Sequence, residues 1–416
     1  MFIILGRTTQ NDAPLFNAAP EPMLVNQAQH TPGAPIRVFA NRNGIFLSCP
    51  GASLSSRQAE LLIGTAAGGT TSAPPSDALT PGNAYSAVPA EIADALGVAG
   101  KTTPLVPIPA GTGSPAAVAT PSKEGAVDAE SKNPEVPSAK RKVPRSRSHL
   151  LRQQEEVDLI TARLQYLCRL IGRARAPYCP LNGIMLIVPM ASTSNDDDAQ
   201  QMGAVCRRDL ATIREVLQIR CPFITVLGGL EKLDGFREFT QRIPRELASQ
   251  RLGQDFPLMP DLDPDAIRKM IDSGVQWVCK GMVPRAAFRL LKTESSGGTS
   301  SEAAAINAHL FRFVQETAER GKRYAQIAVR AAMAEGPALL AGCYLAGTGA
   351  NQNSEQAFIT GCFRLLTENQ NYVSWTSQAL SEEAEYYRMT RIGYAVTWIM
   401  IATMVFLGYF LWPRSY

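Results

Sequence analysis

The sequence has few of the residues that build metal centres and catalytic triads. Its 416 residues include only three histidines, His30, His149 and His309, which are far apart. The eight cysteines contain no C-x-x-C pair and have no histidine at zinc-ligand spacing. These patterns argue against structural zinc, redox-dithiol chemistry and a histidine-based triad. We therefore expect no metal site and no catalytic residues, and the cysteines favour a reducing compartment.

The chain also lacks a strong charge of either sign. It has 41 Lys and Arg against 37 Asp and Glu, which gives a formal charge of +4. This balance does not indicate a protein that coats nucleic acid, so no nucleic-acid partner is expected. The hydrophobic fraction of 45% is that of a globular protein and excludes a wholly disordered chain.

Aromatic residues are almost absent from one long stretch, residues 65–147. It holds 12 of the 29 prolines and a single aromatic residue, Tyr85. Such a composition cannot bury enough apolar surface to offset the entropy of ordering, which predicts a disordered insert. The insert ends in the basic run Lys140–Arg147. We interpret this run as a solvated linker end, with anionic lipid or RNA as alternative ligands.

Apolar runs on both sides of the insert predict one α/β domain. Before the insert they occupy residues 2–5 and 44–49, and after it they occupy residues 183–188 and 222–227. Helices are predicted over residues 157–171 and 207–217, the first from apolar residues at steps of three and four. Nearly unbroken apolar strands that alternate with amphipathic helices indicate a mostly parallel sheet covered on both faces. The two amino-terminal strands would complete a sheet whose other strands follow the insert.

Beyond Gly235 the pattern becomes mostly helical. Helices are expected over residues 236–247, 264–271, 301–334 and 355–366, with a late strand over 339–345 and a Gly/Ser loop over 295–300. The predicted organisation is therefore a first part of the α/β domain (1–64), the insert (65–147), the rest of the α/β domain (148–235), a mainly helical extension (236–391) and a transmembrane helix (392–412).

The predicted transmembrane helix, Ile392 to Trp412, contains no charged residue. A helix of this length spans a hydrocarbon core of about 30 Å at a rise of about 1.5 Å per residue. Arg388 and Arg391 precede it, Arg414 follows it, and aromatic residues lie near both ends. The alternative is a buried helix of the core. The flanking arginines and the cysteines favour a single-pass protein whose body is cytoplasmic, with no cleavable signal peptide.

The apolar run that ends at Gly6 stands where a phosphate-binding loop of the GxxxxGK[ST] type would begin. Counted from Gly6, the second glycine position holds Asn11, the lysine position holds Asp12 and the Ser/Thr position holds Ala13. An anion in place of the lysine repels phosphate. The second strand ends at Ser48, where a nucleotide hydrolase would carry an acidic magnesium ligand.

Five segments, in this order, resemble the cytoplasmic domain of the IcmF/TssM family, the inner-membrane component of type VI secretion systems. They correspond to the family's phosphate loop, DTAG-like segment, NGV-type strand, TKxD-type strand end followed by GF, and late LLRG strand. The matching residues are Leu5-Gly6-Arg7, Ser48-Cys49-Pro50-Gly51, Asn182-Gly183-Ile184-Met185-Leu186, Val226 to Phe236, and Leu339 to Tyr344. The resemblance covers roughly residues 2–59 and 148–412.

The resemblance implies a P-loop-NTPase-like fold whose nucleotide site is degenerate. Besides Asn11, Asp12, Ala13 and Ser48, the lysine of the TKxD-type motif is replaced by Gly229, and only Glu231 keeps an acidic character. We therefore expect no cofactor and no nucleotide hydrolysis. The family's amino-terminal transmembrane hairpin and periplasmic region are not matched, which implies either a late start or a reduced, stand-alone version.

These observations favour a pseudo-NTPase scaffold anchored in the bacterial inner membrane. By resemblance, its partners are a DotU/TssL-like membrane protein and possibly baseplate components. One alternative is an ATP or GTP hydrolase that uses Gly6, Thr8, Thr9 and Glu231 in non-standard roles. Another is a tail-anchored adaptor unrelated to secretion.

Three further features have ordinary structural interpretations. The run Asp196-Asp197-Asp198 is expected to cap the helix that follows it, because it lacks the ligand spacing of a calcium loop. Gly235-Phe236 is expected to form a turn and a core anchor. Trp277 and Trp375 are candidates for either core packing or partner contacts.

Overall fold

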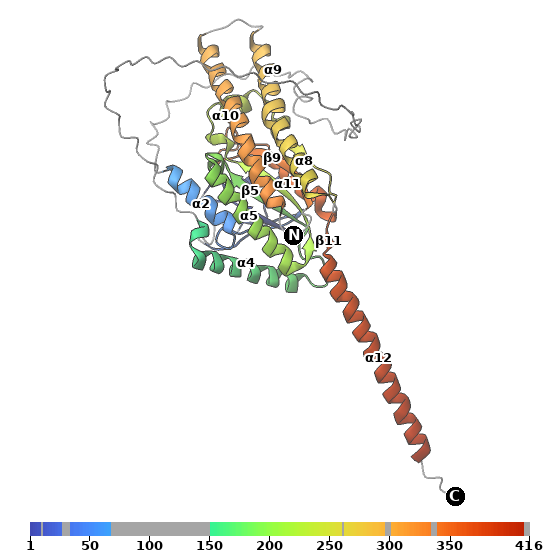
Figure 1. Cartoon of the computed structure of the whole chain (residues 1–416). Coiled ribbons are helices and arrows are strands. Elements are labelled where there is room, and N and C mark those ends of the chain that lie inside the picture. Colours follow the sequence, from blue (N-terminus) through green and yellow to red (C-terminus); the bar gives the residue numbers. More distant parts are fainter. Residues whose placement is uncertain are drawn as a thin grey trace, which may run out of the picture. The chain divides into compact units, whose positions relative to one another are not determined.

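The computed structural model describes residues 1–9, 11–26, 34–67, 150–259, 262–295, 301–333 and 339–411 (Figure 1). Several predictions lie outside these residues. They concern the Pro-rich insert beyond residue 67, its basic run, His30, His149, the loop residues 296–300 and the end of the transmembrane helix at Trp412.

Five parallel strands form the centre of a nine-stranded sheet. In spatial order they are β4 (Gly44–Ser48), β1 (Phe2–Gly6), β5 (Gly183–Pro189), β7 (Pro222–Gly228) and β9 (Leu339–Thr348). β1 pairs with β4 on one side and β5 on the other, so strands from both sides of the insert share one sheet, as predicted. The mostly parallel sheet is confirmed, and β9 extends beyond the predicted 339–345.

Short antiparallel strands extend this sheet, and sequence reasoning missed them. β3 (Arg37–Asn41) pairs with β4, and β2 (Val25–Asn26) pairs with β3. At the other edge β8 (Leu252–Asp255) and β10 (Gln356–Ala357) both pair with β9. A separate two-stranded sheet joins β6 (Ile219–Arg220) to β11 (Ser374–Trp375). None of these strands is a nearly unbroken apolar run of the kind from which the other strands were predicted.

Helices cover both faces of the sheet, as the continuous apolar strands predict (Figure 1). In β1, Ile3 and Leu5 point into one core, while Phe2 and Ile4 point into the other. This alternation is the two-residue period of a strand. The larger core lies under α2 (Leu54–Ala67), α4 (Gln154–Arg175), α5 (Asp196–Leu217), α8 (Pro264–Gln276) and α10 (Ser301–Ala332), and the smaller one under α1 (Ala13–Asn17) and α11 (Ile359–Glu368).

Two predicted helices have different bounds because of local chemistry. The helix expected over 236–247 is split into α6 (Phe236–Gln241) and α7 (Arg245–Ala248). Pro244 stands at the break, where a proline ring and its missing N–H prevent helix continuation. The helix expected from residue 355 begins only at Ile359, because residues 356–357 form β10.

The helix α8 is longer than predicted and continues into a helix that the sequence reasoning missed. A π-helical segment, η5 (Trp277–Met282), joins α8 to α9 (Val283–Ser295). Pro284 is the second residue of α9, two positions after the end of this segment. A wider turn accommodates the proline ring and the hydrogen bond that proline cannot donate. Short 3₁₀ segments complete the described structure: η2 (Leu150–Arg152), η3 (Met190–Thr193), η4 (Leu230–Lys232) and η6 (Asn369–Asn371).

The expectation that Asp196-Asp197-Asp198 caps a helix needs correction. The cap of α5 is Asn195, whose Oδ1 accepts a hydrogen bond from the Asp198 backbone N–H at 2.7 Å. The three aspartates form the first turn, where negative charge stabilises the helix dipole. α5 therefore begins at Asp196 rather than at residue 207. The turn and core anchor at Gly235-Phe236 are confirmed, since Gly235 has φ +88° and Phe236 is fully buried.

A buried carboxylate joins the amino-terminal part of the chain to the part beyond the insert. Asp209 in α5 is 1% exposed and accepts hydrogen bonds at the start of α2. The donors are the Ser53 hydroxyl at 2.7 Å, the Leu54 N–H at 3.0 Å, and the N–H and hydroxyl of Ser55 at 2.8 and 2.7 Å. Burial raises the pKa of Asp209, whereas these donors lower it. The carboxylate satisfies N–H groups that have no partner within the helix.

Replacing Asp209 should therefore destabilise the whole fold. We expect Asp209→Ala to lower the free energy of unfolding by about 3 kcal/mol, because it leaves several buried donors unsatisfied. The exposed Asp197→Ala is the matched control in α5 and should cost about 0.5 kcal/mol or less. Urea unfolding of the detergent-purified chain, followed by circular dichroism, measures both. Equal midpoints for the two variants would contradict the structural role of Asp209.

Candidate functional site

The carboxyl ends of the parallel strands are the place where an open α/β sheet binds ligands. The chain leaves β1 to reach β4 on one side, and β5 lies on the other side of β1. This change of direction is a topological switch point, which creates a crevice beyond the strand ends. The residues after Gly6 therefore lie where the sequence analysis placed a phosphate-binding loop.

Gly6 allows the chain to turn sharply at this point. Its φ is +79°, and a Cβ atom there would collide with the Ile187 carbonyl group of β5. The Gly6 N–H donates to the Ser56 hydroxyl of α2 at 3.0 Å. Its amide is therefore engaged by the protein itself rather than directed to a phosphate.

Asp12 forms a buried polar cluster with Arg37 and Ser48. Its Oδ2 accepts from Arg37 Nη1 at 3.2 Å and from the Ser48 hydroxyl at 2.8 Å. The three residues are 6%, 7% and 3% exposed, respectively. Arg37 is opposite Ser48 in the pairing of β3 with β4. The carboxylate that would repel phosphate is thus neutralised by an internal guanidinium group.

The helix that follows the loop is poorly suited to bind an anion. α1 has only five residues, and Pro14 removes one backbone donor from its first turn. The Ala13 N–H donates to the Asn11 side-chain oxygen at 3.1 Å. A phosphate loop relies on several free N–H groups at the start of a longer helix. Asn11 and Ala13 therefore lie in the expected loop, but their geometry serves a turn.

A second polar cluster lies beyond the ends of β7 and β9. Glu231 Oε2 accepts from the Thr348 N–H at 2.9 Å, and the Thr348 hydroxyl contacts the Thr8 hydroxyl at 2.7 Å. Lys232 Nζ donates to the Thr8 carbonyl at 2.9 Å. Burial raises the pKa of Glu231, although the Thr348 N–H and Lys232 lower it. Gly229, with φ +92°, precedes this segment and starts η4.

The structure thus brings the predicted site residues to one edge and divides them between two clusters. Asp12 and Ser48 are bonded to each other, whereas Glu231 reaches the loop only through Thr348 and Thr8. Within the described part of the chain, no group of three His, Cys, Asp or Glu side chains could hold a metal ion. All eight cysteines are free thiols, and six of them are buried.

Sequence reasoning missed the cations that complete these clusters. Arg37 belongs to no nucleotide-site motif, and its role depends on the unpredicted strand β3. Lys232 directly follows Glu231, but its contact with Thr8 joins residues 224 positions apart.

The other candidate functional element is the carboxyl-terminal helix α12 (Ser377–Leu411). Among the described helices, one is long and apolar enough to cross a membrane, and it covers residues 377–409. Its most apolar 18-residue stretch has a mean hydropathy of 1.7, and none of that stretch is buried. α12 begins well before the predicted start of the span at Ile392. The predicted span is therefore the distal part of a longer continuous helix, whose proximal part we call the stem (Ser377–Arg391).

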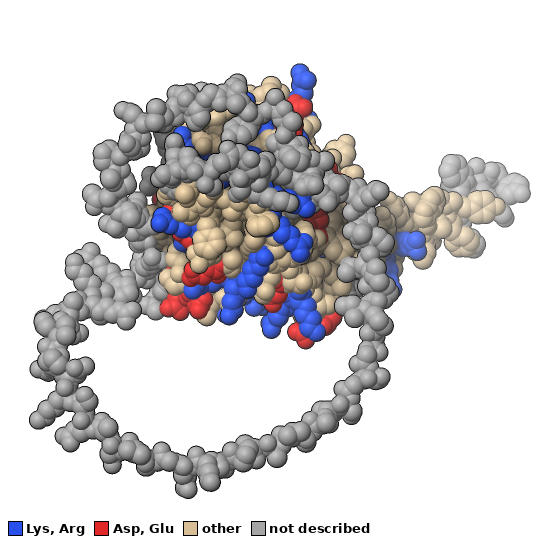
Figure 2. All heavy atoms as spheres, turned by 90° about the horizontal axis from the view of Figure 1, so that it is seen from above, with Lys and Arg blue, Asp and Glu red and all other residues tan. Residues whose placement is uncertain are grey.

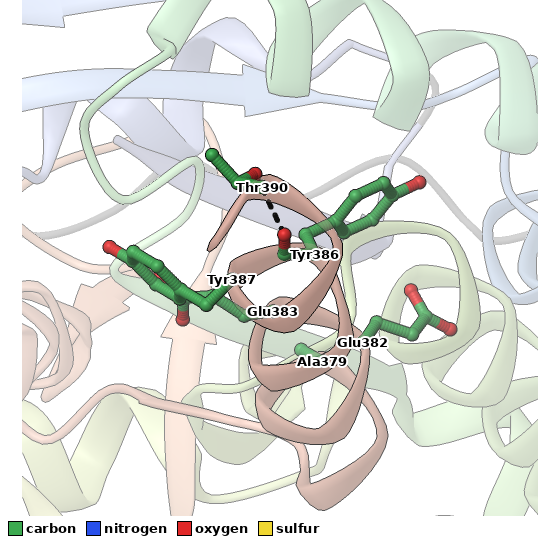
Figure 3. Close-up of a pocket in the computed structure, with 6 residues that line it drawn as sticks. All are labelled: Ala379, Glu382, Glu383, Tyr386, Tyr387 and Thr390. Atoms are coloured by element: carbon green, nitrogen blue, oxygen red, sulfur yellow. Dashed lines mark hydrogen bonds between the residues drawn. The ribbon is translucent and has the colours of Figure 1, made fainter. Parts of the chain in front are cut away.

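A hollow of about 410 Å³ borders the stem, but it is not a ligand site. Figure 3 shows that its six lining residues all belong to one helix, with Tyr386 and Tyr387 pointing in different directions. The hydrogen bond drawn there, from the Thr390 hydroxyl to the Tyr386 carbonyl, lies within the helix. A small-molecule site needs convergent polar groups in a concave pocket, which this surface does not provide.

Comparisons with known proteins provide one match. The family model described as IcmF-related N-terminal domain matches residues 160–380, just over half of the chain. The match runs from α4 into the stem and includes Gly229 and Glu231, whereas the loop at Gly6 and the Asp12 cluster lie outside it. No curated protein and no solved structure matches the chain.

The buried pair of Asp12 and Arg37 makes a testable prediction. Arg37→Met should lower the free energy of unfolding by about 3 kcal/mol, because it leaves a buried carboxylate without its cation. Adding Asp12→Ala to this variant should recover part of the loss. The exposed Arg42→Ala, in the turn between β3 and β4, is the control and should be nearly neutral. Strictly additive effects in a urea-unfolding mutant cycle would contradict the pairing.

Proposed function

The chain belongs to the IcmF-related family, and on this premise we propose that it is a membrane-anchored cytoplasmic scaffold of a type VI secretion apparatus without nucleotide hydrolysis. Family membership itself indicates an IcmF-like component of type VI secretion, and IcmF-like proteins are associated with membranes. Our proposal adds three points to this: the scaffold role, the cytoplasmic orientation of the body and the absence of nucleotide hydrolysis.

The Asp12 cluster is the observation that carries the proposal. An active phosphate loop presents a lysine to the phosphates and a hydroxyl to magnesium. Here Asp12 occupies the lysine position, and Ser48, at the acidic position, donates to Asp12. Moving a triphosphate next to this carboxylate would require breaking its buried bond with Arg37, which costs several kcal/mol. This argues for a P-loop-like fold that has lost its chemistry.

The second support is the exposed apolar surface of α12. Ile392, Trp398 and Phe406 are each more than 60% exposed, along a helix segment without charges. Such a surface is unfavourable in water and suits the hydrocarbon core of a bilayer. Arg388 and Arg391 lie on the body side of the segment, which favours a cytoplasmic body and a single pass through the bacterial inner membrane.

The partners follow from the same family relationship. We propose a DotU/TssL-like membrane protein as the first partner, with baseplate components as further ones. The stem offers Leu380, Tyr386, Tyr387 and Met389 as exposed apolar groups beside the membrane, each more than half exposed. A neighbouring membrane protein can cover such groups without displacing the core of the body.

Nucleotide should have no effect on stability. We expect the melting temperature of the detergent-purified chain to stay unchanged with magnesium and ATP or GTP on the order of 1 mM, because a ligand that binds the native state must stabilise it. Differential scanning fluorimetry measures this, with an active P-loop hydrolase in the same detergent as the positive control. A reproducible rise would support the alternative hydrolase with Gly6, Thr8, Thr9 and Glu231 in its site.

Membrane anchoring and partner choice can be tested together. The full chain should resist alkaline carbonate extraction, whereas a variant that ends at Arg391 should be released, because it lacks the apolar segment. Mild-detergent affinity purification from native membranes, followed by mass spectrometry, should then recover a DotU/TssL-like protein with the full chain. Release of the full chain by carbonate would overturn the anchor, and recovery of unrelated clients alone would favour the adaptor alternative.

A further inference from the structure

The outer side of α4 combines exposed apolar side chains with arginines. Six exposed residues form it: Leu159, Arg163, Tyr166, Arg169, Leu170 and Arg173. The three apolar ones are between 43% and 62% exposed. Because α4 is an uninterrupted α-helix with about 3.6 residues per turn, the six side chains fall within an arc of about 120°. The opposite side of the helix is buried in the larger core. We call this outer side the α4 face.

The positive charge of the α4 face is not balanced by carboxylates. Those of α4 lie at its start, within residues 155–158, and the sequence has no further Asp or Glu before Asp196. None of the three arginines forms an ion pair with a residue that the structure describes, and Arg163 Nη1 donates to the Gly51 carbonyl at 3.3 Å. On the upper face of the body, by contrast, Figure 2 shows Asp and Glu beside Lys and Arg. The α4 face therefore favours an occupant that is both anionic and apolar.

The α4 face lies at the end of the body from which α12 departs. A Cβ atom on Gly172 of α4 would be 3.8 Å from Leu217 Cδ2, so the last turns of α4 pack beside the end of α5. The next residue, Gln218, accepts from the Thr376 N–H at 2.9 Å, directly before α12 begins. Figure 1 shows α4 across this end of the body and the tip of α9 at the opposite end. A bilayer that holds α12 therefore lies beside the end that carries α4.

We propose that the α4 face binds the anionic headgroups of the bilayer that holds α12. This inference rests on the membrane anchoring proposed above. The arginine guanidinium groups match lipid phosphates in charge and in bidentate hydrogen-bond geometry. The leucine and tyrosine side chains suit the boundary between headgroups and acyl chains, where a basic amphipathic helix places its apolar groups. An anionic bilayer offers both kinds of contact, and α12 brings it to this end of the body.

A tilt of α12 can close the distance between the α4 face and the lipid. The stem spans about 21 Å, but the headgroup layer, about 5 to 8 Å thick, and the length of an arginine side chain fill part of this distance. Transmembrane helices tilt by about 20° on average and by up to about 40°. Because α12 departs beside the last turns of α4, a tilt toward α4 lowers this side of the body onto the headgroups. The other side of the stem stays open for a protein partner.

The test uses the full chain with the photoreactive residue benzoylphenylalanine in place of Tyr166, reconstituted into vesicles of phosphatidylethanolamine and phosphatidylglycerol. Irradiation should attach lipid to residue 166, as detected by mass spectrometry. The same group in place of the exposed Phe288, on α9, is the matched control and should capture no lipid. Flotation of the vesicles reports the anchor separately. Protein that floats without lipid attached at residue 166 overturns the α4 contact and leaves the anchor intact, whereas protein that does not float contradicts both.

Charge variants separate headgroup binding from mere proximity to the bilayer. Arg169→Ala with Arg173→Ala should lower the yield of the lipid adduct at residue 166 about tenfold, because each arginine near an anionic surface strengthens binding. Arg237→Ala with Arg268→Ala removes the same charge from exposed positions outside α4 and should leave the yield unchanged. Equal yields from the two double variants would contradict the proposal. Capture of a second copy or another protein at residue 166 in native membranes, in place of lipid, would overturn it.

Discussion

The position of β1 at the centre of the sheet is the constraint on which the rest of the structure depends. Residues 2–5 are at most 1% exposed, and β1 forms parallel ladders with β4 and β5. The chain must therefore bring its first residues next to β5, which follows the long insert. The entropic cost of closing so long a loop grows only with the logarithm of its length, a few kcal/mol. Burying the β1 side chains offsets this cost, at about 2 kcal/mol for each large one.

Contacts between the parts of the chain before and after the insert also fix the conformation at the carboxyl edge of the sheet. Asp209 fixes the start of α2, and Ser56 of α2 then accepts the Gly6 N–H. Arg37 supplies a permanent cation at Asp12, in the region where a nucleotide hydrolase would hold a removable metal ion. If the edge is a degenerate site, as we propose, its conformation no longer depends on a ligand. A surface of constant shape suits assembly, whereas a nucleotide switch needs two states.

Features that arise from a local pattern of apolar residues could be predicted from the sequence, whereas contacts between distant residues could not. The buried face of α4 and the four apolar strands were predictable, because burial imposes a period on the sequence. The split at Pro244 was also readable, although the prediction extended the helix across it. Arg37 and Lys232 could not be placed, since their contacts with Asp12 and Thr8 depend on how distant strands align. Asp209 was equally hidden, because its partners Ser53 and Ser55 precede it by more than 150 residues.

If α12 is the membrane anchor, as we propose, the stem also sets the distance between the body and the bilayer. Gln218 ends α5 with φ +52°, and its carbonyl accepts from the Thr376 N–H just before α12 begins. From Ser377 the helix continues without interruption to Leu411, so no flexible linker separates the stem from the apolar segment. Fifteen helical residues span about 21 Å, which leaves room beside the bilayer for a second protein. A tail-anchored adaptor needs only attachment, whereas an uninterrupted helix also fixes a distance, which favours the scaffold.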